Sequence, residues 1–93
     1  MAGNRNYRKV GEKIVKILLS SSNWQHQKTA TLLSSKLLEW PEEFIQKNLV
    51  TFVNKNVCKD PDDKISIKVY AVLCNETEWD MRYKMNVLSG RLA

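Results

Sequence analysis

Hydrophobic residues recur at helical spacing in five segments of the chain, and a polar turn sequence separates each segment from the next. The second segment is the clearest example, because Ala30, Leu33 and Leu37 fall at i, i+3 and i+7 on one side of a helix. A run of Ser and Asn precedes this segment and can cap it, and Pro41 ends it. The pattern predicts five helices, over residues 7–19, 24–39, 42–56, 63–75 and 78–92.

We expect the hydrophobic stripes of these segments to pack into one core, because 93 residues suffice for a single domain. The prediction is a compact all-α domain of stacked antiparallel helical hairpins over residues 1–93, with residues 1–5 flexible. Cys74 has hydrophobic neighbours and is expected in the core. The other predicted core residues are Val10, Ile14, Ile17, Leu18, Trp24, Ala30, Leu33, Leu37, Trp40, Phe44, Ile45, Leu49, Phe52, Val53, Ile65, Val69, Val72, Leu73, Met81, Met85, Leu88 and Leu92.

Residues 64–74 fit two kinds of secondary structure. As a helix they bury Ile65, Val69 and Leu73 on one side, and as a strand they alternate and are rich in β-branched residues. We favour the helix, because a strand would need a partner and only residues 50–59 could supply one.

One set of hydrophobic positions in the middle of the chain is Leu33, Leu37, Ile45, Leu49 and Phe52. Their spacing resembles that of the winged-helix family. The resemblance implies an alternative fold, in which residues 57–70 form a β-hairpin wing and residues 41–54 form a helix that enters a DNA major groove. Two glutamates stand at the end of that helix that should approach phosphates, which counts against the alternative.

Two junctions between predicted helices, at residues 18–30 and 58–69, share a polar turn followed by a basic and small-residue pattern. Both resemble the helix–turn–helix junction of HEAT-type repeats, whose units are two antiparallel helices of about 40 residues. The resemblance covers residues 5–75 and implies stacked hairpins that present helix faces to other proteins. Gln27 and Ser66 depart from the family pattern, which usually has arginine there.

Positive charge is concentrated at the start of the chain. Residues 1–40 carry seven Lys and Arg against two acids, a balance of +5, whereas residues 41–93 carry eight of each sign. Such a cluster can bind an acidic partner or phosphates, although cations of this kind also serve simply to solvate a helix face. The candidate binding residues are Arg5, Arg8, Lys9, Lys13, Lys16, Lys28 and Lys36.

Side chains that catalysis or metal binding would require are scarce. His26 is the one histidine and is expected on a helix surface, so we expect neither a zinc site nor a Ser–His–Asp site. Cys58 and Cys74 stand without neighbouring ligands, and three isolated glycines form no phosphate loop. We therefore expect a protein that is not an enzyme and holds no cofactor or metal.

No hydrophobic run approaches the roughly 20 residues that cross a bilayer, and the first residues lack the apolar part of a signal peptide. We expect an intracellular protein, in the cytoplasm or nucleus, that does not bind membranes.

The leading hypothesis for function is a scaffold or adaptor module that binds another protein through helix faces. Tyr7, Met81, Tyr83 and Met85 would supply adaptable contacts. The alternative is nucleic-acid binding through the basic first helices. The partner, the oligomeric state and whether the chain belongs to a longer repeat array stay open.

Overall fold

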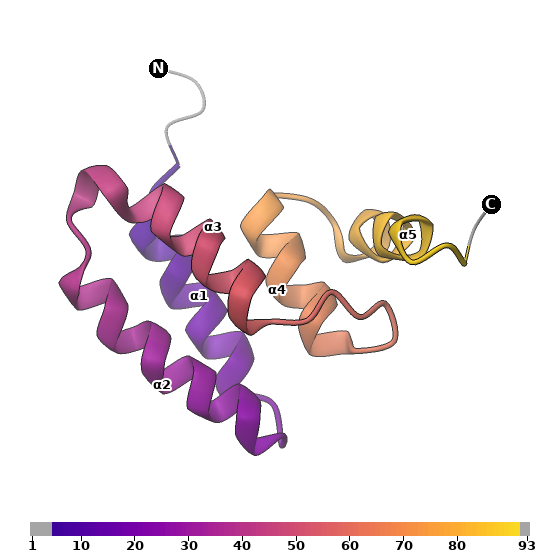
Figure 1. The fold of residues 1–93 in the computed structure, drawn as a ribbon, viewed down its shortest axis with the longest axis horizontal. Coiled ribbons are helices and arrows are strands. Elements are labelled where there is room, and N and C mark those ends of the chain that lie inside the picture. Colours follow the sequence, from indigo (N-terminus) through magenta and orange to yellow (C-terminus); the bar gives the residue numbers. More distant parts are fainter. Residues whose placement is uncertain (1–4, 92–93) are drawn as a thin grey trace.

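The computed structural model describes residues 5–91, and every regular element in that range is a helix (Figure 1). The helices are α1 (Tyr7–Leu19), α2 (Trp24–Glu39), α3 (Ile45–Asn56), α4 (Lys64–Cys74) and α5 (Glu78–Leu88), with a 3₁₀ turn, Glu42–Phe44, before α3. The all-α prediction with five helices is therefore confirmed. The winged-helix alternative is wrong, because residues 57–70 lead into α4 instead of forming a hairpin.

Four of the helices begin at a side chain that caps their free N–H groups. Asn6 caps α1, Asn23 caps α2, Asp63 caps α4 and Thr77 caps α5. In each case the side-chain oxygen accepts a hydrogen bond from a backbone N–H two or three residues later, at 2.9 to 3.1 Å. Such a cap stabilises a helix by about 1 kcal/mol, so these polar residues fix the starts that the sequence predicted.

A residue in the left-handed conformation follows each of α4 and α5, directly after α4 and one residue further on after α5. The φ angle is 56° at Asn75 and 81° at Gly90. Backbone hydrogen bonds from the residues at and after Gly90 return to α5 and close it at Leu88. The predicted fifth helix, 78–92, is therefore too long within the described range, and Leu92 lies outside that range.

The other helices are arranged around α1. It packs against α2, α3 and α4, whereas the extensive contacts of α5 are with α4. In Figure 1, α2 and α3 run in opposite directions with α1 behind them, and α5 lies at the edge of the molecule. The molecule is consequently flat, with dimensions of 41 × 37 × 18 Å.

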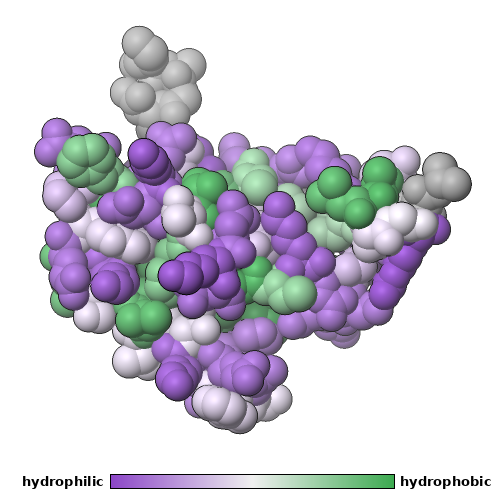
Figure 2. Space-filling view, in the orientation of Figure 1, coloured by the Kyte–Doolittle hydropathy of each residue, from purple (hydrophilic) through white to green (hydrophobic). Residues whose placement is uncertain are grey.

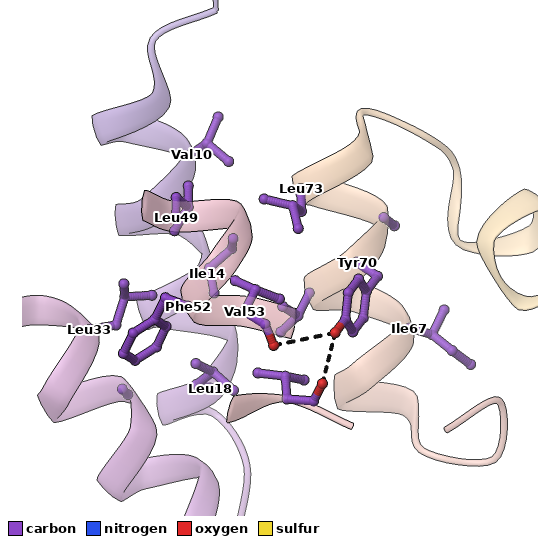
Figure 3. Close-up of a cluster of buried hydrophobic side chains, with 14 of the residues drawn as sticks. Val10, Ile14, Leu18, Leu33, Leu49, Phe52, Val53, Ile67, Tyr70 and Leu73 are labelled. Carbon is purple, nitrogen blue, oxygen red and sulfur yellow. Dashed lines mark hydrogen bonds between the residues drawn. The ribbon is translucent and has the colours of Figure 1, made fainter. Parts of the chain in front are cut away.

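The core lies where α1, α3 and α4 meet and extends to α2 (Figure 3). Ile14 and Leu18 of α1, Leu33 of α2 and Val53 of α3 have no exposed surface. Gly11 lets α2 pack directly on the backbone of α1, because a Cβ atom there would lie only 2.6 Å from a side-chain carbon of Leu37. A side chain at this position would therefore require the Leu37 side chain to move.

Tyr70 connects α4 to the end of α3. Its hydroxyl lies 2.8 Å from the backbone carbonyl of Val57 and 3.3 Å from that of Val53, and it can donate its proton to either (Figure 3). Burial raises the pKa of Tyr70 to about 12, because a phenolate ion would lose its hydration there.

Four of the predicted core residues are exposed instead. Trp24 is 65% exposed, because nine residues at 100° per residue place it opposite the buried Leu33 on α2. Phe44 is exposed in the 3₁₀ turn, and Cys74 and Leu88 are exposed at the last residues of α4 and α5. The remaining predicted core residues of the described range are buried or pack against the core.

The predicted flexible start falls on residues 1–4, which lie outside the described range, and on Arg5. The Arg5 side chain is bound to the end of α4 by hydrogen bonds.

Candidate functional site

Arg5, one of the seven predicted binding cations, is bound to the protein itself. Its guanidinium donates hydrogen bonds to the backbone carbonyls of Val72 and Leu73, each at 2.7 Å. These carbonyls belong to the last turn of α4, where C=O groups lack helical partners and the helix dipole is negative. The guanidinium also lies 5.2 Å from the ring centroid of Tyr7. Arg5 therefore caps α4 and is not free for an outside anion.

Arg8 caps the end of α2 in the same way as Arg5 caps α4. Its guanidinium donates to the backbone carbonyl of Leu37 and, at 3.3 Å, to that of Trp40, both at the end of α2. It also forms an ion pair of 3.2 Å with a carboxylate oxygen of Glu42 in the 3₁₀ turn. Two cations of the predicted binding surface thus hold helix ends together.

Lys9, Lys13 and Lys16 are exposed at successive turns of α1. Spacings of four and three residues place them along one side of the helix. The ion pairs found between residues 5 and 91 do not involve these three lysines.

Lys28 and Lys36 belong to a row along α2 that also contains Trp24 and Leu32, with a spacing of four residues. The Lys28 ammonium lies 5.8 Å from the ring centroid of Trp24, and the Lys36 ammonium lies 3.9 Å from a carboxylate oxygen of Glu39. The seven predicted cations therefore do not form one surface: two are caps, three lie along α1 and two lie along α2.

An open cleft of about 290 Å³ lies between α2 and α3, and we call it the α2–α3 cleft. Its apolar floor consists of Leu32, Trp40 and Phe52. Lys36 on α2 and Lys55 on α3 line it from the two walls, together with amide and hydroxyl side chains of α3. The described residues that line this cleft include no carboxylate.

A second depression lies on the other side of α2, against α1. It consists of two adjoining hollows of about 320 and 380 Å³ that share Val15, Ser34 and Leu38. Leu38 is 87% exposed. Because both Glu12 and Lys16 line this depression, its charge is mixed.

The outward side of α5 carries Trp79, Tyr83 and Val87 at i, i+4 and i+8, and we call these residues the α5 face. Trp79 is 72% exposed and Tyr83 is 53% exposed. Their rings stack at 6.1 Å between centroids with an interplanar angle of 5°. Figure 2 shows some hydrophobic residues, in green, on the surface in the region of α5. The α5 face is thus preformed and open.

Of the four adaptable contacts predicted from the sequence, Tyr83 is the exposed one. The prediction that Met81 and Met85 contact a partner is wrong, because both are buried on the side of α5 that packs on α4. Tyr7 is half-buried and packs against the core.

His26 joins the turn before α2 to the start of α4. Its Nδ1 lies 2.7 Å from Oγ of Ser21, and its Nε2 lies 3.6 Å from a carboxylate oxygen of Asp63. His26, predicted on a helix surface, is therefore partly buried, and its ring lies between a serine and an aspartate that the sequence analysis did not connect with it. Ser21 is buried and its hydroxyl also accepts the N–H of Asn23, while Asp63 caps α4. The grouping fixes two turns and leaves the serine oxygen little room for a substrate.

Comparisons of the chain with models of protein families, with curated proteins and with solved structures found no match. Between residues 5 and 91 no helix is long and apolar enough to cross a membrane. In the same range no three His, Cys, Asp or Glu side chains are grouped so that they could hold a metal ion.

Sequence reasoning missed both the α2–α3 cleft and the α5 face, although each has a signal. Trp79, Tyr83 and Val87 are spaced by four residues and lie opposite the methionine stripe. The row along α2 has the same spacing. What the sequence did not provide was the position of Lys55, which comes from another helix.

Proposed function

We propose that this chain is a non-enzymatic helical module that binds other proteins, as a scaffold or adaptor. The observation that carries the proposal is the α5 face, which exposes Trp79 and Tyr83 although the opposite side of α5 already packs on α4. Contiguous exposed hydrophobic surface marks interaction sites. Trp and Tyr are also the residue types that contribute most to binding energy in protein interfaces.

The α5 face is large enough to matter energetically. A buried aromatic side chain removes roughly 150–250 Å² from water, at roughly 25 cal/mol per Å². Covering the exposed parts of Trp79 and Tyr83 is therefore worth on the order of 5 kcal/mol before the costs of association are subtracted. The parallel stacking of the two rings reduces the ordering cost, because the rings already support each other.

The resemblance to HEAT-type repeats fits this proposal. α1 and α2 are joined by residues 20–23 and pack closely, as the two helices of a repeat unit do. Helical repeats stack by burying hydrophobic faces against one another, and the α5 face is hydrophobic. This favours a helical partner that stacks on α5.

A specific observation also favours nucleic acid as a second candidate partner. Lys9, Lys13 and Lys16 form one exposed row on α1 and take no part in the ion pairs found between residues 5 and 91. Contacts from such a row would be to phosphates and would carry little sequence preference.

The test of the proposed function is affinity capture with the tagged chain, followed by quantitative mass spectrometry. The variant is Trp79→Ala/Tyr83→Ala, and the matched control is Trp24→Ala/Phe44→Ala, which also removes two exposed aromatic residues. We expect proteins that are retained by the wild type and the control and lost from the α5 variant. Equal profiles for all three chains would rule out the α5 face as the binding surface.

Fluorescence anisotropy with mixed-sequence DNA and RNA tests the second candidate. Three phosphate contacts predict that log K falls against log salt with a slope of about −2.7 on duplex DNA. Binding with this slope that disappears in Lys9→Ala/Lys13→Ala/Lys16→Ala would favour nucleic acid. The absence of binding at low salt would remove this candidate.

A further inference from the structure

We propose that the α2–α3 cleft is the docking site for an acidic amphipathic helix of a partner protein. This proposal rests on the proposed function, since the occupant is a protein, but it concerns a surface separate from the α5 face. Three observations carry it: the floor of the cleft, the charges on its walls and the arrangement of the helices that border it.

The floor of the cleft is hydrophobic and is packed against the core. Phe52 is 8% exposed, and Trp40 packs against it edge to face, with 6.0 Å between centroids and an interplanar angle of 70°. Leu32, which is partly exposed on α2, extends this floor toward the start of the helix. Such a floor accepts an aliphatic or aromatic side chain of a ligand without rearranging.

The charged residues that line the cleft are both lysines. Lys36 lies on α2 and Lys55 on α3, so each of the two helices contributes one positive charge. Glu39 approaches Lys36 at 3.9 Å, but both side chains are exposed and a pair of this kind is weak. Carboxylates of a ligand can therefore take the place of Glu39 beside Lys36, which makes the cleft complementary to an acidic partner.

The bordering helices form a groove that suits another helix. α2 and α3 run in opposite directions on one side of α1 (Figure 1). The lining residues extend from Leu32 to Trp40 on α2 and from Asn48 to Asn56 on α3, which is roughly 12 Å or about two turns on each helix. A helix that lies in this groove presents one hydrophobic row to the floor and its flanking residues to the lysines.

The geometry of the aromatic residues favours a peptide over a single-stranded nucleic acid. Bases stack on exposed faces of aromatic rings, but here Phe52 is buried and Trp40 is half-buried against it. The cleft therefore offers a pocket for a side chain and not a platform for a base.

Trp40 provides a signal from within the cleft. The other two tryptophans, Trp24 and Trp79, are exposed and lie outside it. The variant Trp24→Phe/Trp79→Phe therefore keeps the fold and leaves Trp40 as the single tryptophan. Circular dichroism checks that this variant retains the helical content of the wild type.

The experiment titrates this single-tryptophan chain with a synthetic amphipathic peptide of about 15 residues, or four helical turns. The peptide carries Leu at i, i+4 and i+7 and Glu on both flanks. Control probes are the same peptide with Lys in place of Glu, the same peptide with Ala in place of Leu, and a single-stranded oligonucleotide. We expect a saturable change of Trp40 fluorescence with the acidic peptide, which the two control peptides do not produce.

Two charge-reversal variants locate the site. Lys36→Glu/Lys55→Glu should weaken the binding of the acidic peptide at least about tenfold, because attraction becomes repulsion at both walls. Lys9→Glu/Lys13→Glu changes the net charge equally but on α1, and it should leave the affinity within about twofold, since neither residue lines the cleft and exposed charges are screened by salt.

Several outcomes would overturn the proposal. The first two are that the acidic peptide produces no saturable change of Trp40 fluorescence and that the basic peptide binds equally well. The other two are that both charge-reversal variants lose affinity equally and that the oligonucleotide binds more tightly at Trp40. None of them bears on the α5 face, whose capture experiment measures a different surface. Failure of the docking proposal and failure of the proposed function are therefore distinguishable.

Discussion

α1 and α5 have similar lengths, 13 and 11 residues, and both begin at a side-chain cap, but they differ in their neighbours. α1 lies against three helices and buries residues at four positions, whereas α5 lies against α4 and buries Met81 and Met85. The hydrophobic residues on the other side of α5 stay exposed. Hydrophobic spacing thus predicts a helix, but the number of neighbouring helices decides which of its residues are buried.

The cations of the two helices differ in the same way. Arg8 at the start of α1 binds carbonyls at the end of α2, while Lys84 of α5 pairs with Glu76 at the surface. The hydrogen bond that Lys84 donates to Glu76 raises the pKa of Lys84, and the Lys84 side chain remains 57% exposed to water and salt. A charged side chain is therefore structurally important in this molecule when it caps the end of a helix.

The largest expected effect comes from the core around α1. Ile14→Ala should lower the free energy of unfolding by about 2–5 kcal/mol, because Ile14 is fully buried and the cavity cannot close. The matched change on α5, Val87→Ala, should alter it by less than about 0.5 kcal/mol, as at other surface positions. Urea unfolding measures both. Similar losses for the two variants would mean that the α5 face is buried in solution.

A smaller effect is expected from the arginine caps. Arg8→Ala should cost about 1.5–3 kcal/mol, since it removes charged hydrogen bonds from the end of α2. Lys84→Ala should shift the melting temperature less than Arg8→Ala does, because an exposed ion pair contributes little. Thermal unfolding at low and high salt compares them. If Lys84→Ala lowers the melting temperature more than Arg8→Ala does, the proposed difference between the cations of α1 and α5 is wrong.

Tyr70, on the helix that links the two regions, should give the smallest effect and one that depends on pH. Tyr70→Phe removes the hydrogen bond to α3 and should cost about 1 kcal/mol at neutral pH. The folded-state pKa of about 12 exceeds the ordinary value of 10.0, so the folded chain holds the phenolic proton more tightly than the unfolded chain.

This contribution is fully present below pH 10 and is lost as the pH rises to about 12. The stability of the wild type should therefore fall below that of Tyr70→Phe over this interval, because a rise of about two pKa units corresponds to roughly 2.7 kcal/mol and the hydrogen bond to about 1 kcal/mol. Urea unfolding of both chains across the interval measures the difference, in which the titration of lysines cancels. A difference that stays constant would place the hydroxyl in water.

Most of the fold could be predicted from the sequence, because its signals are local. Asn23, Asp63 and Thr77 mark helix starts by their own chemistry, and Pro41 marks an end. The fifth helix was predicted too long because the stripe through Leu88 continues in the sequence, although Gly90 closes the helix. A hydrophobic stripe in the sequence does not show where the neighbouring helix that covers it ends.

The candidate surfaces could be predicted much less well, because they depend on which helices lie side by side. Nothing in the sequence near Arg5 indicates that its partners are the carbonyls of Val72 and Leu73. The same is true of Lys36 and Lys55, which face one cleft from different helices. Charge counting identified a basic region but not which cations are already bound within the protein.

The bond between Arg5 and the end of α4 also sets the order in which the chain can assemble as it is made. Arg5 precedes its acceptors by 67 and 68 residues. At roughly 5–20 residues per second, a ribosome produces these carbonyls roughly 3–13 seconds after Arg5. During that interval α1 can pair with α2, which follows after a short turn, but its first arginine has no helix end to bind. Arg5, although it is synthesised early, is thus held in place only after α4 has been made.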